Sequence, residues 1–272
     1  MAASARGNSN KHGNNNSSDN NSTENSRKRK SSTRNGAGIL RLSQRDIDGL
    51  LICAEHYAAP YDLLAQALGV GAERLPEIVK RWRNIGYAAS GRLGPGPTWC
   101  WLTREGMSAT GFRYSAGKPS MGRLAHTRAV LAARLWLEGG PAWQQRQGWW
   151  CSERRLHTGR GQPGRARALG GHMPDAEVHW PSLEDSPYAG QIWAVEVELT
   201  AKPVARTASI MTELIWANRY AAIVYLTSPG ARHVVTTAAL RLPEADRVRI
   251  AIRTLPKAAL VPGLTRGSEP SS

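Results

Sequence analysis

The chain has 272 residues, of which 36 are Lys or Arg and 21 are Asp or Glu, so its formal net charge is +15. A hydrophobic fraction of 41% is enough for a packed core and excludes a wholly disordered chain. No apolar run approaches the roughly 18 residues of a membrane span, and the first part of the chain lacks the apolar core of a secretory signal. The three cysteines are widely spaced, which excludes a paired-cysteine metal knuckle and argues against a disulfide framework. We therefore expect a cytoplasmic protein that does not bind membranes.

The excess of basic residues is spread over the whole chain. Such a charge favours a polyanionic partner, most simply double-stranded DNA, over ordinary solubility charge. Residues 1–39 are rich in Asn, Ser and Gly and have little to bury, so we expect a disordered arm. Its basic run Arg27–Lys30 fits a phosphate-binding arm, a nuclear signal or a solubilising cluster.

Residues 40–118 are predicted to form three helices and then a hairpin. Apolar spacing places the helices after the N-cap residue Ser43, over 63–68 and from Leu75, with strands at 87–90 and 98–102 around a Gly/Pro-rich tip. The first helix is expected to bury one face, made of Ile47, Leu50, Leu51 and Ala54. This order of elements is typical of a winged helix-turn-helix domain, whose third helix enters the DNA major groove.

The outer face of the third predicted helix carries most of the candidate DNA-binding residues. The candidates are Arg74, Lys80, Arg81, Arg83 and Asn84 on this helix and Arg92 on the tip of the hairpin. Basic and amide side chains of this kind contact phosphates and base edges. The alternative is a winged helix that makes protein contacts only.

Residues 119–256 are predicted to form an α/β domain with a mixed sheet, in the order α-β-β-β-α-β-α-β, and 257–272 a flexible tail. The expected elements are a helix from Leu124 that Gly139 ends, strands at 149–156, 173–180 and 191–200, a helix from Pro203, a strand at 222–226, a helix at 231–240 and a final strand around 248–252. The apolar strand at 222–226 is typical of the middle of a sheet.

Acidic residues in this sheet are the candidate chemistry. Glu196 and Glu198 are two apart on one strand, so both project from the same face, about 6–7 Å apart. Asp175 and Glu177 share a face on the preceding strand. Asp175 beside the two glutamates would make an oxygen-rich site for Mg²⁺ or Mn²⁺, and such an ion polarises a scissile phosphate and activates water. The alternative is ion pairing at a solvated surface, with the candidate partners Arg154, Arg155 and Lys202.

Two resemblances rest on these residues. Pro174-Asp175 followed by Glu196-Val197-Glu198 resembles the PD-(D/E)xK restriction-endonuclease-like superfamily. Over about residues 40–228 the chain is similar to the replication-relaxation family of plasmids and integrative elements, in which a winged helix precedes a nuclease-like domain. The shared motifs are Leu42–Asp46, Trp101–Gly106, His126, Ser152–Arg154, Pro174-Asp175 and Glu196–Glu198.

The resemblance implies roles for single residues. Asp175 would be the metal-binding aspartate and Glu196 the first acidic residue of the (D/E)xK motif. Glu198 stands where that motif has lysine, and Lys202, four residues later at the start of the next helix, is the candidate substitute. Glu153 would add a carboxylate from the first strand of the sheet. We interpret His126 as a packing residue between the two domains.

Three functions follow from these observations. The first is a DNA-binding protein of a plasmid or other mobile element that acts in replication or transfer initiation, with a relaxase or replication initiator as partner. The second is an active metal-dependent endonuclease that uses Asp175, Glu196, Glu198 and Lys202. The third is a transcriptional regulator, in which the second domain serves for dimerisation as a homodimer or for other interactions.

Overall fold

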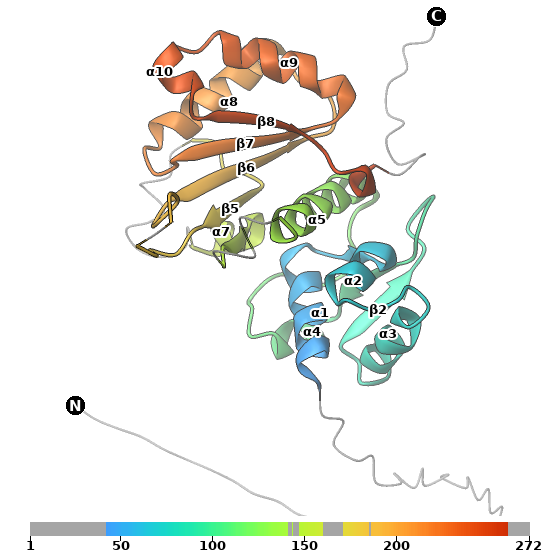
Figure 1. Cartoon of the computed structure of the whole chain (residues 1–272). Coiled ribbons are helices and arrows are strands. Elements are labelled where there is room, and N and C mark those ends of the chain that lie inside the picture. The colour runs from blue at the N-terminus through green and yellow to red at the C-terminus, as the bar shows by residue number, and fades with distance from the viewer. Residues whose placement is uncertain (1–41, 141–142, 144–146, 160–170, 185, 261–272) are drawn as a thin grey trace, which may run out of the picture. The chain divides into compact units, whose positions relative to one another are not determined.

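The computed structural model describes residues 42–140, 143, 147–159, 171–184 and 186–260 (Figure 1). The arm predicted for 1–39 and most of the tail predicted for 257–272 lie outside these ranges. The described chain is a mixed α and β structure with two β-sheets, as the sequence predicts. No helix in these ranges is long and apolar enough to cross a membrane.

The first part of the described chain combines four helices with a small antiparallel sheet. Its elements are α1 (Gln44–Glu55), β1 (Ala59–Pro60), α2 (Tyr61–Ala67), α3 (Leu75–Asn84), β2 (Ala88–Gly91), β3 (Trp99–Leu102) and α4 (Arg104–Ala109). The strand order is β1-β3-β2. The three predicted helices and the hairpin are confirmed, whereas β1 and α4 were not predicted.

A hydrogen bond and an ion pair of Asp46, in the first turn of α1, connect this helix to α3. Ser43 caps α1, and the Asp46 carboxylate bonds back to the Ser43 N–H at 2.9 Å. The same buried carboxylate accepts the Trp82 indole N–H at 2.8 Å and pairs with Arg81 at 2.7 Å. Because these bonds turn Asp46 inward, the buried face of α1 differs from the prediction, and Ile47 is 39% exposed.

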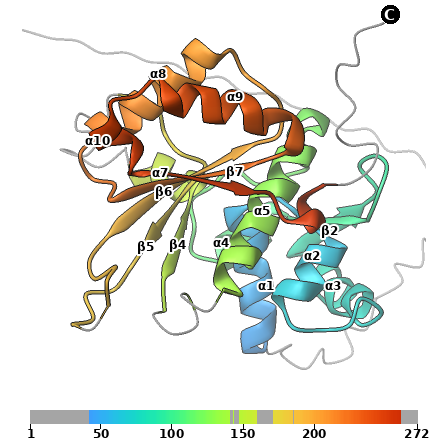
Figure 2. The same ribbon diagram turned by 45° about the horizontal axis from the view of Figure 1, so that its top comes forward.

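The remaining elements build a five-stranded mixed sheet with helices on both faces. They are η1 (Met121–Arg123), α5 (Leu124–Glu138), β4 (Trp149–Ser152), α7 (Glu153–Gly159), β5 (Ala176–His179), β6 (Ile192–Glu198), α8 (Val204–Trp216), β7 (Ala222–Thr227), α9 (Pro229–Leu240), α10 (Glu244–Arg247), β8 (Ile250–Thr254) and η2 (Lys257–Ala259). The strand order is β4-β5-β6-β7-β8, antiparallel from β4 to β6 and parallel from β6 to β8. Helices α8 and α9 cover one face and α5 covers the other (Figure 2).

Alternation along β6 sends its side chains into two separate cores. Val195 and Val197 pack with residues of α5, while Ala194 packs with α8 and α9. Glu196 and Glu198 therefore share one face, as the sequence predicts, and this is the face that α8 and α9 cover.

Three predicted strands differ from the structure. The strand expected over 173–180 runs only from Ala176 to His179, so Asp175 lies just before it. The strand expected over 149–156 ends at Ser152, where α7 begins, because Ser152 Oγ accepts the Arg155 N–H and so caps the helix. The final strand begins at Ile250 rather than at Val248, which is 78% exposed.

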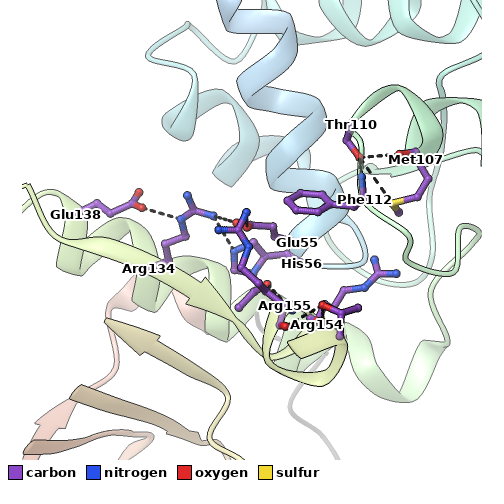
Figure 3. A network of polar contacts seen from close by, with 11 residues as sticks. Glu55, His56, Met107, Thr110, Phe112, Arg134, Glu138, Arg154 and Arg155 are labelled. Carbon is purple, nitrogen blue, oxygen red and sulfur yellow. Dashed lines mark hydrogen bonds and ion pairs between the residues drawn. The ribbon is translucent and has the colours of Figure 1, made fainter. Parts of the chain in front are cut away.

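Arginines that are buried or partly buried join the first part of the chain to α5 and α7 (Figure 3). Arg134 of α5 bonds Glu55 at 2.9 Å and Glu138 at 2.7 Å, and Arg155 of α7 reaches Glu55 at 3.2 Å. Arg154 of α7 donates to the Ala54 carbonyl at 2.6 Å. The expectation that Arg154 or Arg155 pairs with carboxylates of the sheet is therefore wrong, because both side chains turn toward α1.

Candidate functional site

Asp175 directly precedes β5, beside the C-terminal half of β6. Its Oδ2 accepts the Val197 backbone N–H at 2.8 Å, and its Oδ1 lies 3.0 Å from His126 Nε2 on α5. The side chain is 19% exposed. The carboxylate is thus oriented from two sides at a point that solvent reaches.

Glu196 is almost fully buried on β6 and meets a histidine. His172 Nε2 lies 2.9 Å from Glu196 Oε1, while the His172 backbone N–H donates to Glu213 of α8 at 2.8 Å. Burial, and then the nearby Asp175 charge, raise the pKa of Glu196 to about 7, although His172 and Lys202 oppose the rise. Near neutral pH this carboxyl group is therefore populated in both its protonated and its ionised form.

Lys202, in the loop between β6 and α8, pairs with Glu198 at the end of β6. Its Nζ lies 2.7 Å from Glu198 Oε2, and its side chain is 41% exposed. Burial raises the pKa of Glu198, and the Lys202 ammonium counteracts this rise. Lys202 directly precedes Pro203, the N-cap of α8, close to where the sequence predicted it.

Tyr225 approaches the same carboxylates from the neighbouring strand. It is the parallel partner of Glu196 on β7, and it is 1% exposed. Within the described ranges its hydroxyl has no hydrogen-bond partner. Burial, followed by the charges of Glu196, Glu198 and Asp175, holds its pKa well above the usual value. A buried hydroxyl without a hydrogen-bond partner is costly. The Tyr225 hydroxyl can therefore form a hydrogen bond with a ligand or a water molecule at this site.

The two histidines change the predicted picture of the site. His126 was expected as a packing residue, but it bonds Asp175 and its side chain is 43% exposed. Burial lowers the pKa of His126, yet the bond and charge of Asp175, with Glu153 and Glu196, raise it above its usual value. His172 was not singled out, although it stands three residues before Asp175 in the sequence. Contacts with Glu196 and Asp175 likewise raise the pKa of His172 against the effect of burial.

Glu153 and Glu177 occupy neighbouring but different positions. Glu153 begins α7 rather than lying on a strand, and it lines a cavity of about 30 Å³ together with His126 and Asp175. Glu177 is 1% exposed and bonds Arg219 and Tyr220, each at 2.7 Å. Neither carboxylate contacts Glu196 or Glu198 through a hydrogen bond in the described residues.

The donors of this site suit Mg²⁺ or Mn²⁺ by type, since carboxylate oxygens are the preferred ligands of both ions. Each carboxylate also has its own cationic or imidazole partner: His126, His172 or Lys202. In the described ranges, the group of three ligand atoms that all lie within 4.8 Å of one another is a different one, Cys151, Glu177 and His179. An ion at Asp175 would therefore have to draw Glu196 and Glu198 closer together.

The candidate DNA-binding residues of α3 and the β2–β3 tip are all exposed: Arg74, Lys80, Arg81, Arg83, Asn84 and Arg92. Arg81 pairs with Asp46 and Lys80 pairs with Glu77, whereas Arg74, Arg83 and Arg92 form no ion pair with any described residue. Together they give α3 an outward face with cations available for an anionic partner.

Comparison with known proteins identifies no family for this chain. No protein-family model and no curated protein matches it. A solved structure described as "PigF with SAH" aligns with 12% sequence identity and a TM-score of 0.18, over 77% of this chain. The chain spans 61% of the length of that structure. So weak a likeness carries no argument about fold or function.

Proposed function

We propose that this protein binds double-stranded DNA through a winged helix formed by α1 to β3, and that a PD-(D/E)xK nuclease-like domain follows the winged helix in the chain. The observation that carries the proposal is the order α1-β1-α2-α3-β2-β3 with its β1-β3-β2 sheet, combined with the exposed cations of α3. In this arrangement α3 enters the major groove and the β2–β3 tip follows the backbone. By resemblance to the replication-relaxation family, the protein acts in replication or transfer initiation of a mobile element.

Charge and geometry on α3 support this reading. Arg83 and Arg74 are exposed and free of ion pairs with described residues, so no internal bond has to break before they meet a phosphate. The net charge of +15 attracts DNA at long range. Substitution of Arg81 would also break its ion pair with Asp46 and so affect the fold. Substitution of Arg83 therefore tests DNA contact more directly.

Fluorescence anisotropy with a duplex over a range of salt concentrations tests the proposal. Arg83→Ala should weaken binding and reduce the slope of log K against log[salt] by about 0.9 for each lost phosphate contact. Arg241→Ala, at an exposed arginine that follows α9, should leave the slope unchanged. Equal slopes for wild type and Arg83→Ala would contradict the docking of α3 on DNA.

A second function, metal-dependent cleavage of DNA, is supported by the proximity of Asp175, Glu196, Glu198 and Lys202 to one another and to the Tyr225 hydroxyl, which has no hydrogen-bond partner among the described residues. The three carboxylates would hold Mg²⁺ or Mn²⁺, which polarises a phosphate and activates a water. Lys202 would supply positive charge toward the phosphate from its exposed position. His126 holds a proton to a higher pH than a free imidazole, so it is suited to protonate a leaving oxygen.

Nicking of supercoiled plasmid with Mg²⁺ or Mn²⁺ tests this second function, with DNA binding measured on the same samples. Asp175→Ala should abolish nicking and leave binding intact, while Glu184→Ala, at an exposed carboxylate, should nick as the wild type does. Binding without nicking by the wild type would make the second domain a degenerate nuclease fold. Nicking that persists in Asp175→Ala would place the chemistry elsewhere.

A further inference from the structure

A second cluster of ligand-type side chains lies on β4 and β5. Cys151 and Glu177 are directly opposite one another in the antiparallel pair, and His179 follows two residues later on β5. One ligand atom from each of the three lies within 4.8 Å of the other two. Adjacent strands of one sheet hold these side chains, so the cluster is formed without any rearrangement of the backbone.

The donor set differs in kind from the carboxylate site. A thiolate, an imidazole and a carboxylate suit Zn²⁺ and similar transition metals, whereas Mg²⁺ prefers oxygen ligands alone. Three protein ligands with a fourth position open is the pattern of catalytic rather than purely structural zinc sites. The His179 side chain is 28% exposed, which leaves a side from which water can reach the cluster.

Neighbouring residues orient the carboxylate of the cluster. Arg219 donates to Glu177 Oε2 and Tyr220 donates to Oε1, each at 2.7 Å. Metal-ligating carboxylates are commonly hydrogen-bonded in this way by residues that do not touch the ion. His179 Nε2 lies 2.8 Å from Glu177 Oε2, and the Trp149 ring packs at an angle against the imidazole, with ring centroids 4.9 Å apart.

The Cys151 thiol is the member of the cluster whose protonation state a bound metal ion would change. The residue is 5% exposed, and its Sγ forms no hydrogen bond within the described ranges. Burial, and then the Glu177 charge, raise the pKa of Cys151 to about 12, so the metal-free thiol is protonated at neutral pH. A divalent cation supplies the positive charge that a buried thiolate needs, and its binding releases the thiol proton.

We propose that Cys151, Glu177 and His179 form a three-ligand site for Zn²⁺ or a similar transition-metal ion, with its fourth position open to water. The inference stands on these side chains alone and is independent of the proposed DNA-related function. The competing interpretation is a metal-free network in which Arg219 and His179 alone neutralise Glu177. The two interpretations differ in whether the sulfur of Cys151 bonds an ion.

Cobalt substitution tests the proposal on the full chain. The protein is stripped with EDTA and titrated with Co²⁺, and near-ultraviolet absorption reports bonds between thiolate and cobalt. We expect a thiolate-to-cobalt band that saturates at one ion per chain and that Zn²⁺ removes. Co²⁺ bound at the Asp175 site has no thiolate ligand and gives no such band, so the two sites are distinguished.

Single substitutions show which residues bind the cobalt ion that gives the thiolate-to-cobalt band. Cys151→Ser should lose it, His179→Gln should weaken Zn²⁺ affinity at least about tenfold, and Cys100→Ala, at a buried cysteine of β3, should keep it. Circular dichroism of each metal-free variant checks that it is folded. Absence of the band in the folded wild type, or its persistence in Cys151→Ser, would overturn the proposal.

Discussion

Glu196 shows how one buried carboxyl group links the chemistry of the site to stability. It is 4% exposed, and its nearest ionisable partner is His172 at 2.9 Å. Its pKa in the folded chain, about 7, lies above the usual 4.5, so the folded state binds this proton more tightly than the unfolded state does. Its contribution to stability is therefore complete below about pH 4.5 and is lost as the pH rises toward 7.

Glu196→Gln should remove this pH dependence. Because the amide stays neutral and still offers an oxygen to His172, the variant should be more stable than the wild type at about pH 8, by about 2–3 kcal/mol. At about pH 4.5 the two should unfold alike. Urea unfolding in EDTA at several pH values measures both. Glu184→Gln, at an exposed position, is the matched control, and an equal pH slope for Glu196→Gln and wild type would contradict the argument.

The carboxylates of the site and the lysine partner of Glu198 could be predicted at the residue scale, but the histidine partners could not. Glu196 and Glu198 share a face because strand side chains alternate, and a four-residue step brings Lys202 to Glu198. His126 stands 49 residues before Asp175 in the sequence. Nothing local in the sequence indicates that α5 would place this imidazole against the start of β5, so only the packed fold reveals it.

At the scale of elements, the Thr103–Gly106 turn explains why the chain needs a glycine at the start of α4. Thr103 Oγ1 caps α4 by accepting the Gly106 N–H at 3.1 Å, and its hydroxyl donates to the Gly86 carbonyl. A Cβ on Gly106 would lie 1.8 Å from the Tyr87 carbonyl oxygen. The hairpin and α4 therefore approach each other more closely than any side chain allows.

Gly106→Ala should destabilise the protein through this backbone contact. We expect a loss of about 1–3 kcal/mol in the free energy of unfolding, because the Tyr87 backbone has to shift. Gly230→Ala, in the first turn of α9 with open space around it, should be neutral or slightly stabilising. Thermal or urea unfolding of the two variants compares them, and equal stability of Gly106→Ala and wild type would refute the close approach.

Elements with a clear apolar period were predictable, and the shorter ones were not. The positions of α3, α5, α8 and β7 follow from spacing, caps and flanking glycine or proline. Strand β1 has two residues, one of them a proline, and only pairing with β3 makes it a strand. Helix α7 replaces the end of a predicted strand, and the Ser152 hydroxyl that caps it also belongs to a strand, β4, so the residue type alone did not mark the boundary.

At the scale of the whole molecule, Arg154 of α7 connects α1 to the segment that follows strand β4. It is 5% exposed and donates to the carbonyls of Ala54 and Ser115. Its guanidinium lies 4.2 Å from the ring centroid of Tyr57 and 4.6 Å from that of Tyr114. Burial lowers the pKa of Arg154, and the carbonyls and the two rings replace the water that it has lost.

Arg154→Ala should therefore weaken the molecule as a whole. Two carbonyls lose a charged donor and two rings lose their packing, so we expect a loss of about 3 kcal/mol in the free energy of unfolding. Arg241→Ala, at an exposed arginine, should change it by less than about 0.5 kcal/mol. Circular dichroism and tryptophan fluorescence during urea unfolding measure both variants. If Arg154→Ala unfolds at the wild-type midpoint, the arginine does not hold α1 against α7. The position of α1 would then depend on the ion pair between Glu55 and Arg134 of α5.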